Sequence, residues 1–264
     1  MSDYSDYMEC VRKMKPLVHH ITNYVTVNDC ANICICSGGS PVMTDELKDL
    51  DDMVSISNAV VLNMGTLNER TVESMMHAGI AAKKKGVPVV FDAVGAGATA
   101  YRKNVAKLII DRVKPDIVKG NEGEISFLSG IEGGVRGVDS ASSNDNIGRD
   151  VKALAKKLGC IVASTGKTDY VSDGDVLYEL SNGDDMEGNV SGTGCMVTSV
   201  IGSYVGANGA KAESVAVAIS AFNIAAEHAS KNCRGPGSFK VALFDELFSL
   251  KLGELDSEIR IQKL

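Results

Sequence analysis

Short apolar runs that alternate with amphipathic segments restrict the fold of this chain more than any other feature of its sequence. The runs lie at 17–21, 59–63, 87–91, 116–118 and 160–163. Turn residues bound them and they are too short for buried helices, which is typical of strands covered on both faces. The clearest amphipathic segment begins at Asn68, a predicted N-cap, and ends before Gly86 and Pro88. This alternation predicts right-handed crossovers and a mostly parallel central sheet with helices on both faces.

The second half of the chain departs from this alternation. Asp173-Gly174 is a hairpin signal within 168–180, where we expect two antiparallel strands at the sheet edge. The polar stretch 131–147 predicts a loop. After residue 190 we expect helices to the end of the chain, with Pro236 and Gly237 ending one of them. The helices expected in this half are 151–158, 194–206, 211–231 and 239–250.

Length and composition fit one α/β domain in three layers. The chain has 264 residues, of which 44% are hydrophobic, so it can bury a large core. Because we find no internal repeat and no sign of a second domain, we predict one domain over residues 1–264.

Charge and cysteine content exclude several classes of protein. The formal net charge is −7 and there is no basic stripe, which argues against a nucleic-acid partner. No apolar stretch reaches the roughly 18 residues of a membrane span, and the acidic N-terminus does not resemble a signal peptide. The seven cysteines are irregularly spaced, so we expect no disulfide framework and a reducing, cytoplasmic location.

A glycine-rich turn, GNVSGTGC at 188–195, stands directly before an apolar run that reads as a helix. Backbone N–H groups at such a helix start have no helical partner and point at one spot, with the positive end of the helix dipole behind them. We therefore predict an anion site formed by Gly192, Thr193, Gly194 and Cys195, and phosphate is the commonest anion at such sites.

Polar residues end several of the predicted strands. Asp92 follows one run, Lys119 and Asn121 follow the next, and Thr165 follows a third. In an open parallel sheet, ligands bind beyond the carboxyl ends of the strands, so we expect these residues to share one crevice with the glycine turn. With Glu122 and Glu124 close by, the set is that of a phosphoryl-transfer enzyme.

Other chemistries are weaker readings of the sequence. Gly95, Gly97 and Ala100 match a dinucleotide fingerprint with Glu122 as its acidic residue, but Asp92 would then stand beside the pyrophosphate. An NAD(P)-dependent oxidoreductase stays an alternative. We expect the remaining candidate groups to be structural: Cys30, Cys34 and Cys36 on one helix, one of His19 and His20 on a strand, and the late-helix pair Glu227 and His228.

Six segments together resemble the hydroxyethylthiazole kinases, a branch of the ribokinase-like superfamily, over nearly the whole chain. They are VHHITNYVTVNDCANICICSGGSPVMTDE (18–46), VVLNMGTLNE (60–69), VVFDAVGAGAT (89–99), DIVKGNEGEI (116–125), STGKTDYVSDG (164–174) and GNVSGTGCMVTSVIG (188–202). The resemblance implies a ribokinase-like fold and the phosphorylation of the primary alcohol of 5-(2-hydroxyethyl)-4-methylthiazole by ATP and Mg²⁺, a salvage step toward thiamine diphosphate. It also implies a homotrimer with active sites between subunits.

The resemblance also implies roles for individual residues. Met43 and Gly192 contact the thiazole, and Asn23 and Val25 shape the same pocket. Lys119, Thr165 and Asn121 serve ATP, and Asp92 and Glu124 serve Mg²⁺ directly or through water. Cys195, with Gly194 and Thr193, stands at the transferred phosphoryl group.

This sequence departs from the family pattern at two positions. Ala93 follows Asp92 where the family often has proline, and Lys119 stands where it often has arginine, which alone forms a bidentate fork to phosphate. Cys195 stands where most ribokinase-like enzymes have an aspartate base, but a cysteine there is typical of hydroxyethylthiazole kinases. Whether Cys195 is a base or only shapes the anion site stays open, and we expect it to contribute modestly.

Three further functions stay open at this point. One is a kinase for hydroxymethylpyrimidine or pyridoxal, against which Cys195 argues. The others are an ATP-dependent hydrate dehydratase and a binding protein without catalysis. The intact Asp92, Glu124 and glycine turn argue against the binding protein.

Overall fold

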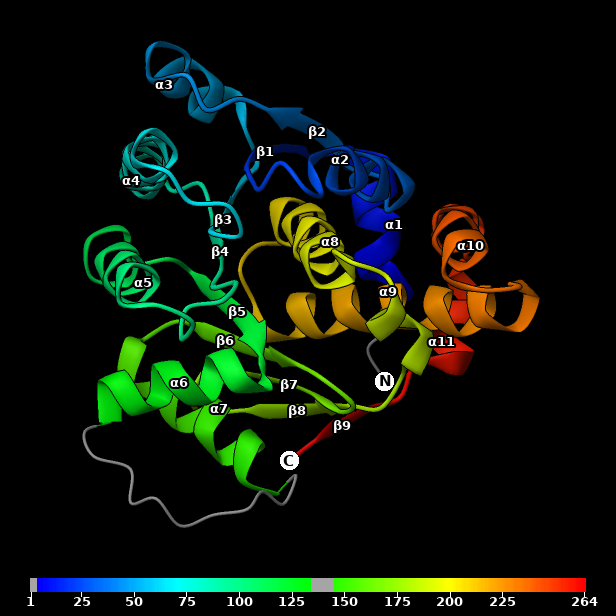
Figure 1. Ribbon diagram of the computed structural model, residues 1–264. Helices are drawn as coiled ribbons and strands as arrows, with labels where there is room; N and C mark the ends of the chain where they lie inside the picture. Colours follow the sequence, from blue (N-terminus) through cyan, green and yellow to red (C-terminus); the bar gives the residue numbers. More distant parts are fainter. Residues whose placement is uncertain (1–3, 134–144) are drawn as a thin grey trace.

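The computed structural model describes residues 4–133 and 145–264 and shows an α/β fold in three layers (Figure 1). The described strands form one sheet of order β2-β1-β3-β4-β5-β6-β7-β8-β9. Strands β1 to β6 pair in parallel, and β7, β8 and β9 are added antiparallel. The strands are β1 Leu17–Ile21, β2 Ser40–Met43, β3 Ala59–Asn63, β4 Val89–Asp92, β5 Ile117–Asn121, β6 Ile161–Thr165, β7 Asp169–Ser172, β8 Leu177–Leu180 and β9 Ile261–Lys263.

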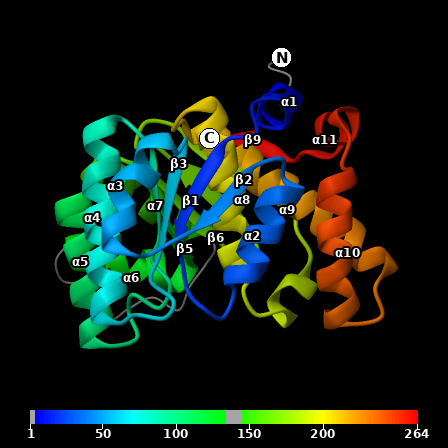
Figure 2. The same ribbon diagram turned by 90° about the horizontal axis from the view of Figure 1, so that it is seen from above.

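Helices cover both faces of the sheet, as the alternation of the sequence predicts. The helices are α1 Ser5–Met14, α2 Val27–Cys36, α3 Leu47–Ile56, α4 Glu69–Lys85, α5 Ala100–Val113, α6 Glu122–Gly133, α7 Asp145–Leu158, the short 3₁₀ helix η1 Asp185–Asn189, α8 Thr193–Asn208, α9 Ala212–Asn232, α10 Pro236–Ser249 and α11 Leu252–Glu258. Helices α3 to α7 lie on one face, and α1, α2, α8, α9 and α10 lie on the other (Figures 1 and 2).

Side chains of the inner strands divide between the two cores because successive residues of a strand point to opposite faces. In β3, Val60 and Leu62 pack in the core with α3 to α7, whereas Ala59 and Val61 pack in the core with α8 and α9. Both faces are thus buried, as the continuous apolar runs predict.

Several local predictions are confirmed. Asn68 caps α4 and accepts a hydrogen bond from the backbone N–H of Thr71 at 3.0 Å. The predicted hairpin is the β7–β8 pair. Cys30 and Cys34 are buried on α2, Cys36 lies on the same helix, and all seven cysteines are free.

Other predictions are wrong or incomplete. The chain does not stay helical to its end, because β9 extends the sheet beyond the hairpin; only one of its three residues, Ile261, is apolar, which is too little for a strand signal. Pro236 begins α10 instead of ending a helix, since proline is well suited to the first helical position. The ends of the loop predicted at 131–147 belong to α6 and α7, and 134–144 lie outside the described residues. No helix within the described ranges combines the length and hydropathy needed to cross a bilayer.

Candidate active site

The functional side chains gather at the carboxyl ends of the parallel strands. Asn63 of β3 pairs with Asp92 of β4, and Asp92 pairs with Lys119 of β5. Val61, Val90 and Ile117 belong to the hydrophobic core on the α8 face of the sheet. Asn63, Asp92 and Lys119 each follow one of them by two residues. Strand alternation therefore directs all three side chains toward the start of α8. Asp92 and Lys119 thus lie side by side, as the sequence predicts.

Asp92 lies fully buried at the centre of this edge. Its Oδ2 accepts hydrogen bonds from Asn63 Nδ2 at 2.9 Å and Thr198 Oγ1 at 2.7 Å. Its Oδ1 has no hydrogen-bond partner, and Lys119 Nζ lies 3.6 Å away from it. Burial raises the pKa of the Asp92 carboxyl, and the Lys119 ammonium opposes that shift.

Lys119 joins Asp92 to the glycine turn. Its buried Nζ donates a hydrogen bond to the carbonyl oxygen of Gly194 at 2.9 Å. Burial lowers the pKa of this ammonium, but the nearby acidic groups, led by Asp92, outweigh burial and the pKa is raised. A cation thus stands between the carboxylate and the start of α8.

The predicted anion turn is the first turn of α8. Gly192, its N-cap, has φ +94°, and a Cβ there would lie 2.3 Å from Thr26 Cγ2, so only glycine fits without displacement. Thr193 Oγ1 donates to the carbonyl oxygen of Glu187 at 3.0 Å and ties the turn to η1. The N–H groups of α8 therefore face the same edge as Asp92 and Lys119.

Cys195 lies in this first turn beside two amide side chains. Its Sγ lies 3.4 Å from Asn23 Nδ2 and 3.3 Å from Asn63 Nδ2. Burial raises the pKa of the Cys195 thiol to about 11, and the Asp92 carboxylate adds to the shift while Lys119 opposes it. At neutral pH the sulfur is a protonated thiol, although it stands at a helix N-terminus, where thiol pKa values usually fall.

Glu124 is held by backbone groups. Its Oε1 accepts from the N–H of Gly95 at 2.6 Å, and its Oε2 from the N–H of Asn121 at 2.7 Å. In return, the N–H of Glu124 donates to Asn121 Oδ1 at 2.9 Å, so Asn121 caps α6. The Gly95 N–H needed by a dinucleotide pyrophosphate is therefore occupied by a carboxylate, which argues against the NAD(P) reading.

The model of the hydroxyethylthiazole kinase family matches residues 8–252 of this chain. The chain belongs to that family. Hydroxyethylthiazole kinases of Methanocella arvoryzae and of a Thermoanaerobacter species are 46% and 45% identical to it, over 96% and 97% of this chain and 95% and 99% of theirs. The structure of the hydroxyethylthiazole kinase protein from Pyrococcus horikoshii has a TM-score of 0.92 at 37% identity and covers both chains fully.

The fold is also that of a more distant kinase. A pyridoxal kinase from Staphylococcus aureus, in complex with AMP-PCP and pyridoxal, has a TM-score of 0.66 at 16% identity, and the match covers 94% of this chain and 98% of that one. At this identity the likeness concerns the fold alone, and it agrees with the ribokinase-like architecture expected from the sequence.

In this family member a small cavity of about 200 Å³ lies at the carboxyl ends of β1 and β2. It is lined by His20, Ile21, Thr22, Tyr24, Val27, Met43, Thr44 and Asp45. Met43 therefore lies where a pocket residue is predicted. The other residues predicted to form the thiazole pocket, Asn23, Val25 and Gly192, do not line this cavity. Asn23 is buried, and Val25 is 60% exposed.

Both strand histidines turn out to be buried. His20 lines this cavity, and its Nε2 lies 3.1 Å from Ser199 Oγ, whereas Nε2 of His19 lies 2.9 Å from the carbonyl oxygen of Thr44. The late-helix pair is structural, as predicted: Glu227 accepts from the N–H of Gly183.

The remaining predicted residue, Thr165, ends β6 opposite Asn121 of β5. Two residues of the site were not predicted, Asn63 and Thr198, both bonded to Asp92. Asn63 ends an apolar run in the same way as Asp92, so the sequence held a signal for it. Thr198 lies inside a helix, where nothing in the sequence distinguishes it.

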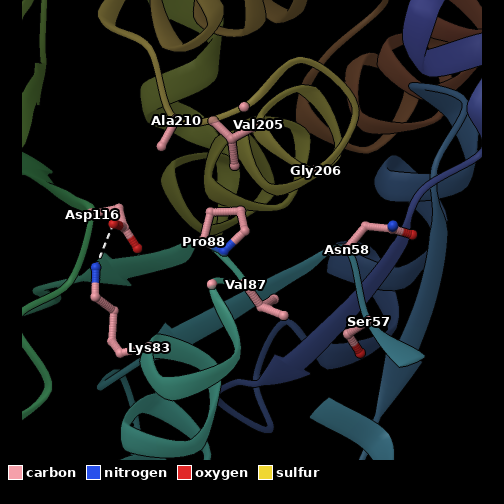
Figure 3. A pocket seen from close by; sticks show the side chains of 11 residues that line it. Ser57, Asn58, Lys83, Val87, Pro88, Asp116, Val205, Gly206 and Ala210 are labelled. Atoms are coloured by element: carbon pink, nitrogen blue, oxygen red, sulfur yellow. Dashed lines mark hydrogen bonds and ion pairs between the residues drawn. The ribbon is translucent and has the colours of Figure 1, made fainter. Parts of the chain in front are cut away.

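A larger cavity, of about 400 Å³, lies at the opposite edge of the sheet, beside the amino ends of β3, β4 and β5 (Figure 3). Lys83 and Asp116 in its wall form an ion pair with each other, and Asp116 Oδ2 also accepts from the N–H of Val89. No residue that lines it has a buried side-chain polar atom without a partner. We therefore take the edge that holds Asp92 as the candidate active site.

Proposed function

We propose that this chain transfers the γ-phosphoryl group of ATP to the primary hydroxyl of 5-(2-hydroxyethyl)-4-methylthiazole, a salvage step in thiamine diphosphate biosynthesis. The observation that carries the proposal is the buried Lys119, which bridges Asp92 and the first turn of α8 in a chain of the hydroxyethylthiazole kinase family. We further propose that residues 1–264 act as one cytoplasmic domain.

Strand order supports a division of the site between two substrates. Met43 and Asn23 lie at the β2–β1 side, and Asn121 and Thr165 lie at the β5–β6 side. Asp92 of β4 stands between them. The thiazole would then bind near β1 and β2, ATP near β5 and β6, and phosphoryl transfer would occur where the two meet at the start of α8.

The first turn of α8 would hold the transferred phosphoryl group. Backbone N–H groups from Gly192 to Cys195 point out of the helix start, and they stabilise charge without moving. Lys119 adds a positive charge next to this turn. Because an ammonium is a point charge, it would neutralise phosphate oxygens without the two parallel bonds of a guanidinium.

The residues present fit a magnesium ion bound mainly through ATP. Asp92 Oδ1 is a buried oxygen without a hydrogen-bond partner, while both oxygens of Glu124 are engaged. The described residues contain no cluster of three or more acidic, histidine or cysteine side chains arranged for a metal. Mg²⁺ typically uses one or two carboxylates with substrate phosphates and water. We assign Asp92 to direct contact and Glu124 to contact through water; the bound ion would neutralise the β and γ oxygens.

Cys195 would shape the acceptor site without removing the hydroxyl proton. With its pKa at about 11, the thiol does not act as a base at neutral pH. Phosphoryl transfer through a loose transition state needs little covalent help from the protein. The hydroxyl oxygen would bond to the γ-phosphorus as the bond to ADP breaks, and the hydroxyl proton would pass to a phosphate oxygen. The acceptor alcohol would therefore be oriented by Cys195 and Asn23, with Met43 against the ring.

We propose a homotrimer whose subunits complete one another's thiazole pocket. The loop after β1 exposes Tyr24 at 77% and Val25 at 60%, and Ile35 of α2 is also exposed. Tyr24 lines the small cavity, so a second copy packed on this apolar surface would close the pocket. Val25, which lies outside the pocket in one subunit, would then reach the pocket of its neighbour.

A Mg²⁺-dependent ATP-consumption assay tests the function. The acceptors are hydroxyethylthiazole, hydroxymethylpyrimidine, pyridoxal and none. We expect turnover with the thiazole alone. Turnover with another alcohol would contradict the substrate, and ATP binding without turnover on any acceptor would favour the hydrate dehydratase or the binding protein.

A further inference from the structure

Asn63 uses every hydrogen-bonding position of its side chain inside the site. Its Nδ2 donates to Asp92 Oδ2 at 2.9 Å and to Cys195 Sγ at 3.3 Å. Its Oδ1 accepts from Asn23 Nδ2 at 3.0 Å and from the N–H of Gly65 at 2.9 Å. The residue is 5% exposed, so water does not compete for these bonds.

The chemistry of the partners determines which way this amide points. The N–H of Gly65 can only donate, so the atom facing it is the oxygen of Asn63. A carboxylate can only accept, so the atom facing Asp92 is the nitrogen. A flipped amide would place oxygen against carboxylate and N–H against N–H, and both contacts would be repulsive.

The same reasoning fixes Asn23. Its Oδ1 accepts from the backbone N–H of Thr26 at 3.0 Å, so its Nδ2 must face Asn63 and Cys195. The Cys195 sulfur thus faces two amide N–H groups, and its own hydrogen is directed away from both asparagines. A single chain of oriented hydrogen bonds runs from Asn23, which we propose shapes the thiazole pocket, through Asn63 to Asp92.

Asn58, which lies just before β3, has a purely structural role and serves as a comparison for Asn63. Its Oδ1 accepts from the backbone N–H of Leu17 at 2.8 Å and joins β3 to β1. Asn63 bonds instead to three side chains of the site. Holding two strands together does not require that arrangement.

We propose that Asn63 is a positioning residue that couples the thiazole pocket to the phosphoryl-transfer groups, by orienting Asn23 on one side and Asp92 and Cys195 on the other. The inference rests on the proposed function and adds to it a residue that acts through others. It predicts that loss of Asn63 lowers both kcat and thiazole affinity, although Asn63 need not touch the substrate.

The test compares Asn63→Ala with Thr198→Val and Asn58→Ala. Thr198 provides the other hydrogen bond to Asp92 Oδ2 and has no bond to Asn23 or Cys195. We measure steady-state kinetics and, without nucleotide, the Kd of hydroxyethylthiazole by calorimetry. Asn63→Ala should lower kcat about 100-fold, as expected when reacting groups are misplaced, and weaken thiazole binding about 5-fold. Thr198→Val should lower kcat and leave the Kd unchanged, and Asn58→Ala should change neither.

A double-mutant cycle on the thiazole Kd tests the route of the effect. If Asn63 acts through Asn23, then Asn63→Ala should add little to the loss already caused by Asn23→Ala. Additive losses of affinity, or an Asn63→Ala variant that keeps the kinetics of Asn58→Ala, would overturn the inference. If Asn63→Ala does not fold, Asn63→Ser, whose shorter side chain still offers one hydrogen-bonding group, enters the same comparison with smaller losses expected.

Failure of the proposed function gives a different result. A wild-type chain that neither binds nor phosphorylates hydroxyethylthiazole contradicts that function. The kinetic comparison is then made with the alcohol that supports turnover, and the affinity comparison and the cycle with the Kd of that alcohol. With that alcohol, Asn63→Ala should still lower both kcat and affinity, Thr198→Val should lower kcat alone, and Asn58→Ala should change neither.

Discussion

The two edges of the parallel sheet each hold a lysine–aspartate pair on neighbouring elements, and the pairs differ in burial. At the carboxyl edge, the side chains of Lys119 and Asp92 are 4% and 0% exposed, with 3.6 Å between the charged atoms. At the amino edge, those of Lys83 and Asp116 are 35% and 26% exposed and in closer contact. A buried pair loses much hydration energy, whereas an exposed pair has little effect either way. The buried pair, with one carboxylate oxygen left unbonded, is therefore the one that stability alone does not explain.

The largest expected effect comes from removing the buried carboxylate. Asp92→Asn should lower kcat about 1000-fold or more, because the charge facing the phosphates and the Mg²⁺ site is lost. Asp116→Asn, at the other edge, is the matched control and should leave kcat unchanged. Mg²⁺ titration of initial rates measures both, and a normal titration in Asp92→Asn would remove Asp92 from the site.

The buried cation gives the next effect. Lys119→Met should lower kcat about 100-fold, since a positive charge next to the anion turn is lost. Lys119→Arg should retain activity within about tenfold, because the charge remains and guanidinium forms good bonds to phosphate. Single-turnover rates with saturating ATP decide this, and equal rates for Lys119→Met and wild type would contradict the role.

Cys195, in the glycine turn beside the buried pair, should have a smaller effect on catalysis than Asp92 or Lys119. Cys195→Ala should lower kcat about tenfold, by disturbing contacts to Asn23 and Asn63, while nucleotide affinity stays the same. Because burial raises the thiol pKa to about 11, the pH profiles of the variant and wild type should coincide between pH 6 and 9. A loss of four or more orders of magnitude in kcat with binding intact, or a thiol-dependent step in that pH range, would make Cys195 a base.

The smallest effect is expected at the amino edge. Lys83→Met should change the free energy of unfolding by less than about 1 kcal/mol and leave kinetics unchanged, because the pair is partly exposed. Urea denaturation provides the measurement, and Lys83→Gln is a second variant with a polar side chain. A large loss of activity in either would mean that the two edges are coupled, which the comparison does not predict.

Part of the candidate site follows from local pattern. Asp92 and Lys119 end apolar runs, and strand alternation places both on the face toward α8. The glycine turn before an apolar helix predicts an anion site because backbone N–H groups are free at any helix start. Asn63 carries the same strand-end signal, but the sequence does not say that it joins Asn23 to Asp92.

Other features depend on contacts between distant segments. β2 lies beside β1 and places Met43 opposite His20, although its four residues give little signal alone. The pKa of Cys195 rises where its helix position predicts a fall, because the packing that buries it brings Asp92 near. Val25 looks like a pocket residue in the sequence but is exposed in a single subunit.

The sequence by itself therefore determined the class of fold, the strand ends that form the candidate site and the glycine turn at the start of α8, which we propose as the anion site. These follow from periodicity and from backbone geometry over a few residues, which need no knowledge of distant neighbours. Only the tertiary structure decided strand order, which carboxylate oxygen stays unbonded and which amides orient the sulfur of Cys195. Those depend on packing between segments far apart in the chain, such as Asn63 and Cys195 at a separation of 132 residues, and no local pattern specifies such contacts.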